Sequence, residues 1–466
     1  MKSSRIVLFI FGVIAALAVL CAVFPEEGVL GLRFPRLSDV LSAAEPATGL
    51  SPEELVELRR ESVLAAQRDE YQVFFREDPA RFYLPDDDIR FFDALFAAFD
   101  RAEQEPVRIV HYGDSQIEED RITGTIRERL QDRFGGSGPG MMPARRYATP
   151  RVGGGSTAEL QRFFSYGDAS YRAGIRQYGP YADFTRLDTV STFNFYPVSR
   201  KDADHFERAT LVAGNLRGTL GVRSRDDKRS VEPGGPLSFV RFELPDSSTH
   251  FSLTASGYAD LYGILLDGKT GIRMDNVAMR GSSGAIFTAM DASQLQAFYK
   301  EENVRLIMLQ YGGNSVPYLK SDKQIGDYAA SVRKQIQLLR ALAPEAAILF
   351  IGPSDMSTVV SGKRRTYPML AGFVDSLRIA ATESGAAYWD IYGVMGGENS
   401  MVQWVSARPP LAGPDYVHFT LAGSRKIGDM FCDALLLYYD YYRWRKQNGK
   451  RYFLAHRWLL VPEGQE

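Results

Sequence analysis

The sequence predicts an α/β protein. We expect a three-layer α/β/α sandwich around a parallel sheet, interrupted by an inserted β-sandwich and preceded by an N-terminal transmembrane helix. Apolar runs of strand length alternate with amphipathic helical segments on both sides of a central region. That region, residues 185–270, holds short β-branched and aromatic runs separated by Gly, Pro and Asp. Because the alternation resumes after it, the β-sandwich interrupts one α/β domain.

The composition excludes several classes of function. The 466 residues are 45% hydrophobic and 24% charged, as in an ordinary globular protein. The formal net charge is −2 and no basic stripe stands out, so we expect no nucleic-acid partner. The two cysteines are Cys21 and Cys432, and the first lies in an apolar segment, so no structural disulfide is expected. His, Cys and carboxylate residues do not form a cluster with the spacing of metal ligands. We therefore expect no metal and no other cofactor.

The N-terminus resembles a membrane anchor. Lys2 and Arg5 precede residues 6–24, a run without charge that is long enough to span a bilayer as a helix. We expect residues 1–25 to form a single anchor in the inner membrane, with its basic end cytoplasmic and the rest of the chain facing the periplasm. A cleaved signal sequence is the alternative.

The lead-in to the α/β domain spans residues 26–105 and contains helices. One helix is predicted to begin after Ser51, which can cap it. A second is predicted over 86–104 from its apolar spacing. The strand "VRIVHYGD" (107–114) follows, and the apolar face of 120–136 predicts the next helix, which Gly135 ends.

Four further segments complete the predicted organisation. Residues 106–184 form the first part of the α/β domain, 185–270 the inserted β-sandwich, 271–445 the second part and 446–466 a C-terminal tail. The second part alternates strands and helices, which implies a parallel sheet that is covered on both faces. Its strands are predicted at 304–314, 346–355 and 386–393, and its helices at 323–342, at 366–384 and from Leu421 onward.

Three polar clusters follow predicted strands or enter the last helix. They are Gly113-Asp114-Ser115, Gly312-Gly313-Asn314 and the segment 415–418, which reads "DYVH". In an open α/β sheet, ligands collect at the carboxyl ends of the strands. Each cluster alone could be an ordinary turn or a helix cap. Their shared placement favours one functional site.

The residue types in these clusters suit acyl transfer. A serine nucleophile needs a base within hydrogen-bond reach and a carboxylate that orients the base. His418 can accept the Ser115 proton, and Asp415 can hold the imidazole in the required tautomer. The oxyanion needs preorganised donors, which the Ser115 backbone N–H, the Asn314 amide and a glycine N–H can provide.

Four sequence blocks resemble those of the SGNH (GDSL-type) hydrolase superfamily. "HYGDSQ" is similar to its first block, "NVAMRGSSG" to its second, "YGGNS" to its third and "DYVHFTLAG" to its fifth. The resemblance covers about 107–140 and 270–440. It implies an SGNH, flavodoxin-like arrangement of the parallel sheet.

The resemblance implies a role for each matching residue. Ser115 would be the nucleophile, and Asp415 and His418 would be the other members of the triad. The Ser115 N–H, the Gly281 N–H and the Asn314 amide would form the oxyanion hole.

The second and third blocks leave two points open. Gly284 competes with Gly281 as the second-block glycine. The third block of the family often reads Gly-x-Asn-Asp, and here Ser315 takes the last place. The local support of Asn314 is therefore open.

The expected function is that of a serine esterase acting through an acyl-enzyme. Among relatives, the chain resembles bacterial extracytoplasmic O-acetyl esterases with an inserted β-sandwich, which implies removal of O-acetyl groups from a glycan. The predicted partners are an acylated glycan or small ester, and the membrane. An O-acyltransferase with the same triad and a non-catalytic glycan-binding protein are alternatives. The sequence leaves the glycan, the acyl group and the oligomeric state open.

Overall fold

The computed structural model describes residues 52–149, 151–198 and 204–456, together with positions 16 and 19. None of the helices in these residues is long and apolar enough to span a membrane. The predicted anchor at 6–24 lies outside the described residues apart from the two single positions, so it stays a prediction.

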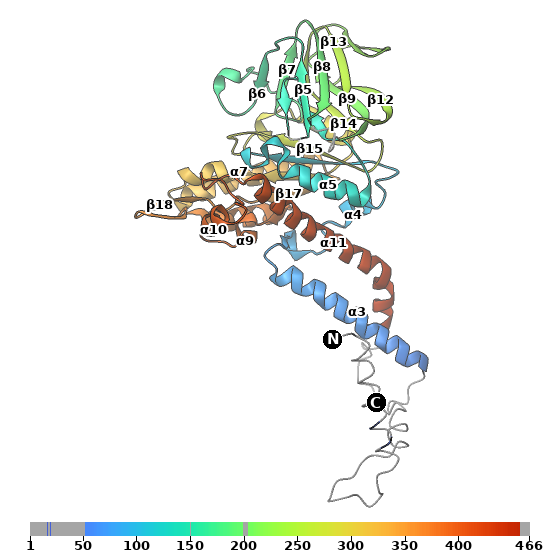
Figure 1. Cartoon of the computed structure of the whole chain (residues 1–466), viewed down its shortest axis with the longest axis vertical. Helices are drawn as coiled ribbons and strands as arrows, with labels where there is room; N and C mark the ends of the chain where they lie inside the picture. Colours follow the sequence, from blue (N-terminus) through green and yellow to red (C-terminus); the bar gives the residue numbers. More distant parts are fainter. Residues whose placement is uncertain (1–15, 17–18, 20–51, 150, 199–203, 457–466) are drawn as a thin grey trace, which may run out of the picture. The chain divides into compact units, whose positions relative to one another are not determined.

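The chain divides into two compact units, Met1–Gln72 and Val73–Glu466. Helix α3 (Pro52–Glu77) begins in the first unit and ends in the second. The second unit contains the α/β domain and the insert (Figure 1). The mixed α/β fold predicted from the sequence is confirmed there.

A six-stranded sheet with the order β1-β20-β17-β16-β2-β15 forms the centre of the α/β domain. Neighbouring strands from β20 to β15 are parallel, and the edge strand β1 is antiparallel to β20. The predicted parallel sheet is therefore present. The strands are β1 (Phe82–Tyr83), β2 (Val107–Gly113), β15 (Ile272–Ala278), β16 (Val304–Gln310), β17 (Ala347–Ile351) and β20 (Ala387–Trp389).

Helices cover both faces of this sheet, because its strands are apolar on both sides. Ile109 and Met308 face the hydrophobic cluster that contains side chains of α4, α5 and α11. Val110 and Ile307 face the cluster that contains side chains of α6, α7 and α8. The helices are α4 (Asp93–Phe99), α5 (Thr123–Phe134), α6 (Ala292–Glu301), α7 (Asp322–Leu342), α8 (Leu370–Glu383), α9 (Ile391–Val394), α10 (Ser400–Ser406) and α11 (Leu421–His456).

The insert is a β-sandwich of two six-stranded sheets. The outer sheet has the order β11-β10-β13-β8-β5-β4. The inner sheet has the order β12-β9-β14-β7-β6, and β3 joins it beside β14. The strands are β3 (Gly140–Met142), β4 (Tyr147–Ala148), β5 (Val152–Ser156), β6 (Arg162–Phe164), β7 (Asp183–Leu187), β8 (Val190–Pro197), β9 (Phe206–Gly214), β10 (Leu220–Ser224), β11 (Asp227–Val231), β12 (Ser238–Ser248), β13 (Phe251–Ser256) and β14 (Ala259–Asp267).

The two sheets begin earlier in the chain than the predicted insert, 185–270. Strands β3 to β6, within residues 140–164, already pair with strands of the insert. Strand β5 reads "VGGGS", and such a glycine-rich run lacks the β-branched and aromatic residues by which strands are recognised. Its pairing with β8 comes from the tertiary structure.

Strand β14 is buried on both faces, since it lies between the sandwich core and the α/β domain. Leu261 and Ile264 belong to the core between the two sheets. Tyr262 and Leu265 belong to the cluster that also contains Val110 of β2. The inner sheet therefore packs on the α/β domain as a layer of it.

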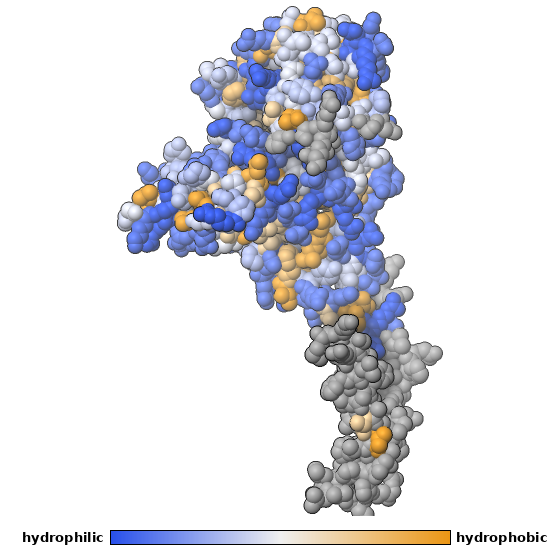
Figure 2. Space-filling model, viewed as in Figure 1, coloured by the Kyte–Doolittle hydropathy of each residue, from blue (hydrophilic) through white to orange (hydrophobic). Residues whose placement is uncertain are grey.

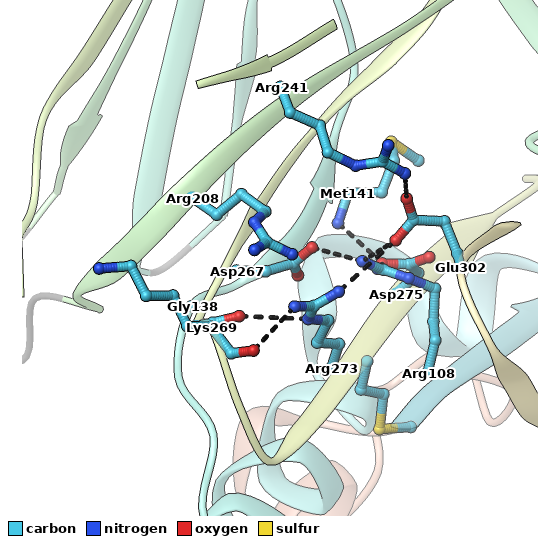
Figure 3. A network of polar contacts seen from close by, with 12 residues as sticks. Arg108, Gly138, Met141, Arg208, Arg241, Asp267, Lys269, Arg273, Asp275 and Glu302 are labelled. Atoms are coloured by element: carbon cyan, nitrogen blue, oxygen red, sulfur yellow. Dashed lines mark hydrogen bonds and ion pairs between the residues drawn. The ribbon is translucent and has the colours of Figure 1, made fainter. Parts of the chain in front are cut away.

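A buried cluster of charges joins the same two parts (Figure 3). Arg108 of β2 is fully buried and forms ion pairs with Asp275 of β15 at 2.6 Å, with Glu302 at 3.1 Å and with Asp267 at the end of β14. Arg241 of β12 also contacts Glu302, at 3.2 Å. Three acids from different segments thus share one buried guanidinium, and Arg273 also pairs with Glu302, at 3.7 Å, so that each buried charge has a partner of opposite sign.

Two predicted helical segments have other boundaries. The helix predicted over 86–104 is reduced to α4, and its first two predicted residues, Asp86 and Asp87, adopt positive φ angles of 53° and 51°. Asp tolerates this left-handed conformation, which breaks a helix. At the other end, α11 continues as far as His456, into the predicted tail at 446–466.

Candidate active site

Ser115 lies at the carboxyl end of β2, in the turn that opens a short 3-10 helix, η2 (Ser115–Asp120). At Gly113, the last residue of β2, a Cβ atom would lie 2.8 Å from the buried Ile117 side chain, so a larger residue would force Ile117 to move. The Asp114 carboxylate accepts a hydrogen bond from the Gln116 N–H at 3.0 Å. These contacts hold the Ser115 side chain at the sheet edge.

The three residues predicted as a triad meet at this edge. Ser115 Oγ lies 2.8 Å from His418 Nε2. His418 Nδ1 lies 2.7 Å from Asp415 Oδ2. The other oxygen, Asp415 Oδ1, accepts the backbone N–H groups of Val417 at 3.0 Å and His418 at 3.1 Å. The Asp-x-x-His spacing therefore forms a turn that orients the imidazole toward Ser115.

The electrostatics of this turn favour an ionised carboxylate. Partial burial raises the pKa of Asp415, but hydrogen bonds from the His418 side chain and from two backbone N–H groups outweigh it, so the pKa lies below its usual value. An ionised Asp415 binds an N–H at Nδ1 of His418. Nε2 is then free to accept the Ser115 hydroxyl proton.

Of the two candidate glycines, Gly281 lies in the cleft that contains Ser115. Its N–H has no hydrogen bond within the part of the chain that the structure describes. The Gly284 N–H instead donates to Ser282 Oγ at 3.1 Å, and Gly284 lines a separate cavity. Gly281 adopts a φ of 77°, a conformation that favours glycine.

Asn314 follows β16 and points toward the nucleophile turn. Its Nδ2 donates to the Ser282 carbonyl oxygen at 3.0 Å and to Asp114 Oδ2 at 3.2 Å. These two acceptors hold the Asn314 side chain in place, which answers the question raised by Ser315 in the third block. To stabilise an oxyanion, the amide has to exchange one of them, since it carries two N–H groups.

The loops after β2, β15, β16 and β17 and the His418 loop line one cleft of about 330 Å³. A cleft of this size suits a small acyl group and the atoms next to it. Tyr318 lies at its rim with 74% of its surface exposed. In the described part of the chain, no group of three His, Cys, Asp or Glu side chains is arranged to hold a metal ion.

Two residues of the site had no role in the sequence analysis. Gln116 donates through Nε2 to the Val417 carbonyl at 2.7 Å, and its Oε1 accepts the Phe419 N–H at 3.4 Å, so it links the nucleophile turn to the His418 loop. Asp114 is buried and accepts hydrogen bonds from the Gln116 N–H and the Asn314 amide. The only available signal was their polarity next to Ser115, at a strand end.

His111 of β2 lies outside the site. It is fully buried, and burial lowers its pKa to about 3, so it stays neutral. Its ring nitrogens contact Thr123 at 2.9 Å and Gln310 at 3.1 Å. These contacts give it a packing role between β2, α5 and β16.

Comparisons with known proteins agree with this geometry. The sequence model of the GDSL-like lipase/acylhydrolase family matches residues 246–426, which hold Gly281, Asn314, Asp415 and His418. The match starts after the first block, which lies on the other side of the insert. No curated protein matches the sequence.

Among solved structures, a peptidoglycan O-acetylesterase superposes with a TM-score of 0.60 at 20% identity, over 74% of this chain and 96% of that one. A family two carbohydrate esterase from Clostridium thermocellum reaches a TM-score of 0.24 at 11% identity, over 55% of this chain and 96% of that one, which is too low to indicate a shared overall fold. Residues 246–426 therefore match the GDSL-like lipase/acylhydrolase family, and the fold of the chain is similar to that of a peptidoglycan O-acetylesterase.

Proposed function

We propose that this protein is an ester hydrolase that removes O-acetyl groups from an extracytoplasmic glycan, with Ser115 as nucleophile. The observation that carries the proposal is the continuous chain of hydrogen bonds from Ser115 Oγ through His418 to Asp415, at 2.8 Å and 2.7 Å. It opens into a cleft whose volume suits an acetyl ester.

The reaction follows from this geometry in two steps. Ser115 Oγ attacks the ester carbonyl while its proton passes to His418 Nε2, and the N–H groups of Ser115 and Gly281 with the Asn314 amide receive the oxyanion. The C–O bond to the sugar breaks, and the sugar oxygen takes the proton from His418. Water then attacks the acyl-enzyme, with His418 again as base, and releases acetate and free Ser115.

Two observations support a glycan as substrate. The fold is similar to that of a peptidoglycan O-acetylesterase over nearly the whole of that chain. Tyr318 exposes its ring at the rim of the cleft, where an aromatic face with a polar tip can pack against a sugar. For the location, the proposal rests on the apolar segment 6–24, which would anchor the hydrolase with its active site in the periplasm.

The test compares Ser115→Ala with Ser354→Ala, a second hydroxyl of the same cleft. Loss of a triad nucleophile typically lowers kcat by about 10³-fold or more, so Ser115→Ala should lose acetate release from an acetylated glycan and from a small acetate ester. Ser354→Ala should keep most of it. A fluorophosphonate should label Ser115, as mass spectrometry of the digested protein would show. Turnover of Ser115→Ala within about tenfold of the parent would refute the proposal.

A further inference from the structure

A hairpin of strands β18 (Ser357–Val360) and β19 (Lys363–Thr366) interrupts the connection between β17 and α8. It projects from the α/β domain at the left of Figure 1. The same end of the molecule shows hydrophilic surface beside a small apolar spot in Figure 2. An isolated two-stranded hairpin is marginally stable in water, so contacts with the rest of the domain have to hold it in place.

The hairpin is basic and carries no acid. Lys363, Arg364 and Arg365 follow one another and are exposed, and residues 357–366 contain neither Asp nor Glu. None of the three cations forms an ion pair with any residue that the structure describes. A second exposed basic hairpin, β10–β11, contains two acids, Asp226 in its turn and Asp227 at the start of β11, and there Arg229 pairs with Asp227 at 2.9 Å. The positive charge of the β18–β19 hairpin is therefore uncompensated.

The base of the hairpin is attached to the active site. The Ser357 N–H donates to the Tyr416 carbonyl at 3.2 Å, and the Arg364 guanidinium lies 4.3 Å above the Tyr416 ring. Tyr416 stands between Asp415 and His418 in the chain. Met356, the residue before the hairpin, lines the cleft. A polymer whose ester lies at Ser115 would therefore pass close to the hairpin.

The strand register separates the three cations. Lys363 pairs with Val360 and Arg365 with Thr358, so these two cations lie on one face of the hairpin. Arg364 pairs with Val359 on the opposite face, where it is held over Tyr416 and donates to the Ser357 carbonyl at 3.3 Å. Arg364 thus fastens the hairpin, and Lys363 and Arg365 remain available to a ligand.

We propose that the β18–β19 hairpin is a docking arm for an anionic glycan, with Lys363 and Arg365 binding its carboxylate groups. The inference rests on the proposed function, since it places a charged polymer chain across the cleft that holds Ser115. Uncompensated cations beside a cleft raise the local concentration of an anionic substrate, and exposed charges of this kind act on encounter and binding. They take no part in the chemical step.

The test uses the double variant Lys363→Gln/Arg365→Gln. The matched control is Arg225→Gln/Lys228→Gln, which removes the same charge from the β10–β11 hairpin. Acetylated polygalacturonate is the anionic polymer, and the same polymer after methyl esterification of its carboxylates is the neutral one. Acetate release is measured on both polymers and on 4-nitrophenyl acetate. Binding of unacetylated polygalacturonate is measured on Ser115→Ala forms of the parent and the variants, which requires no turnover.

The double variant should raise KM for the anionic polymer by about threefold to tenfold with kcat unchanged, as the loss of two exposed charge contacts implies. The difference should vanish at roughly 0.5 M salt, where screening is nearly complete. The neutral polymer, the small ester and the control variant should show no change. Weaker binding of polygalacturonate by the double variant supports the docking arm, whether or not any acetylated substrate is turned over. A complete absence of turnover by the parent protein would count against the proposed function and not against the docking arm.

Three outcomes overturn the inference. The first is an unchanged KM and unchanged binding for the anionic polymer. The second is an equal loss on the neutral polymer, which would indicate a shape effect. The third is an unchanged KM together with lost binding to vesicles that contain phosphatidylglycerol, which would assign the hairpin to a membrane surface.

Discussion

Replacing Asp114 by Asn should change how the stability of the protein depends on pH. Asp114 is buried at the end of β2, where its carboxylate accepts the Gln116 N–H and the Asn314 amide. Burial raises the pKa of this carboxyl from 3.8 to about 6, even though the hydrogen bond from Gln116 and the nearby His418 act in the opposite direction. The substitution keeps the size of the side chain and removes its titration.

The sign and size of the effect follow from linkage. Between the unfolded and folded pKa values, the folded protein holds the Asp114 proton that the unfolded chain has lost. Stability therefore falls as pH rises through that window, and the loss is complete above the folded pKa. About two pKa units at 1.36 kcal/mol each give a loss of about 3 kcal/mol, of which about 2 kcal/mol falls between pH 4.5 and pH 8.

The assay is urea denaturation of the parent and of Asp114→Asn at several pH values across this range. The substitution also alters the contact with Asn314, but that contribution is nearly independent of pH, and all other titrating groups are common to both proteins. The stability of the variant relative to the parent should therefore rise by about 2 kcal/mol from pH 4.5 to pH 8. A difference that stays constant within about 0.5 kcal/mol would refute the raised pKa of Asp114.

Two further substitutions test the supports of the site. Gln116→Leu removes the hydrogen bonds to Val417 and Phe419, so kcat for a small ester should fall about tenfold or more. KM and thermal stability should change little. An unchanged kcat would contradict the positioning role of Gln116. Arg108→Met leaves three buried acids without the cation that they share. The free energy of unfolding, measured by urea denaturation, should fall by about 3–5 kcal/mol. A loss below about 1 kcal/mol would show that the buried cluster tolerates the change.

Much of the parallel sheet could be predicted because its strands are continuous apolar runs between amphipathic helices. The run 304–310 and the helix that begins at Asp322 follow directly from this pattern. The meeting of Ser115 with His418 was predictable because Ser115 follows a strand at the carboxyl edge of such a sheet, where ligands collect, and His418 lies in the loop that enters the last helix. Their catalytic roles stay predictions that the geometry supports.

What the sequence could not show depends on contacts between distant segments. Strand β5 is glycine-rich and pairs only because β8 lies beside it. Asp86 cannot begin the predicted helix because of its own backbone conformation, which the apolar spacing does not reveal. Gln116 acquires a role only because the loop of His418 returns to it from a distant part of the chain.

Strand β14 decides how this protein could be recombined with others. Only residues 268–271 separate it from β15, the strand that leads to Gly281, and Asp267 at its end is an ion-pair partner of Arg108. A graft that transferred the parallel sheet alone would uncover an apolar surface and would separate the buried Arg108 from its partner Asp267. The strands of the two sandwich sheets alternate along the chain and share one core, so the whole sandwich has to be transferred together with the α/β domain.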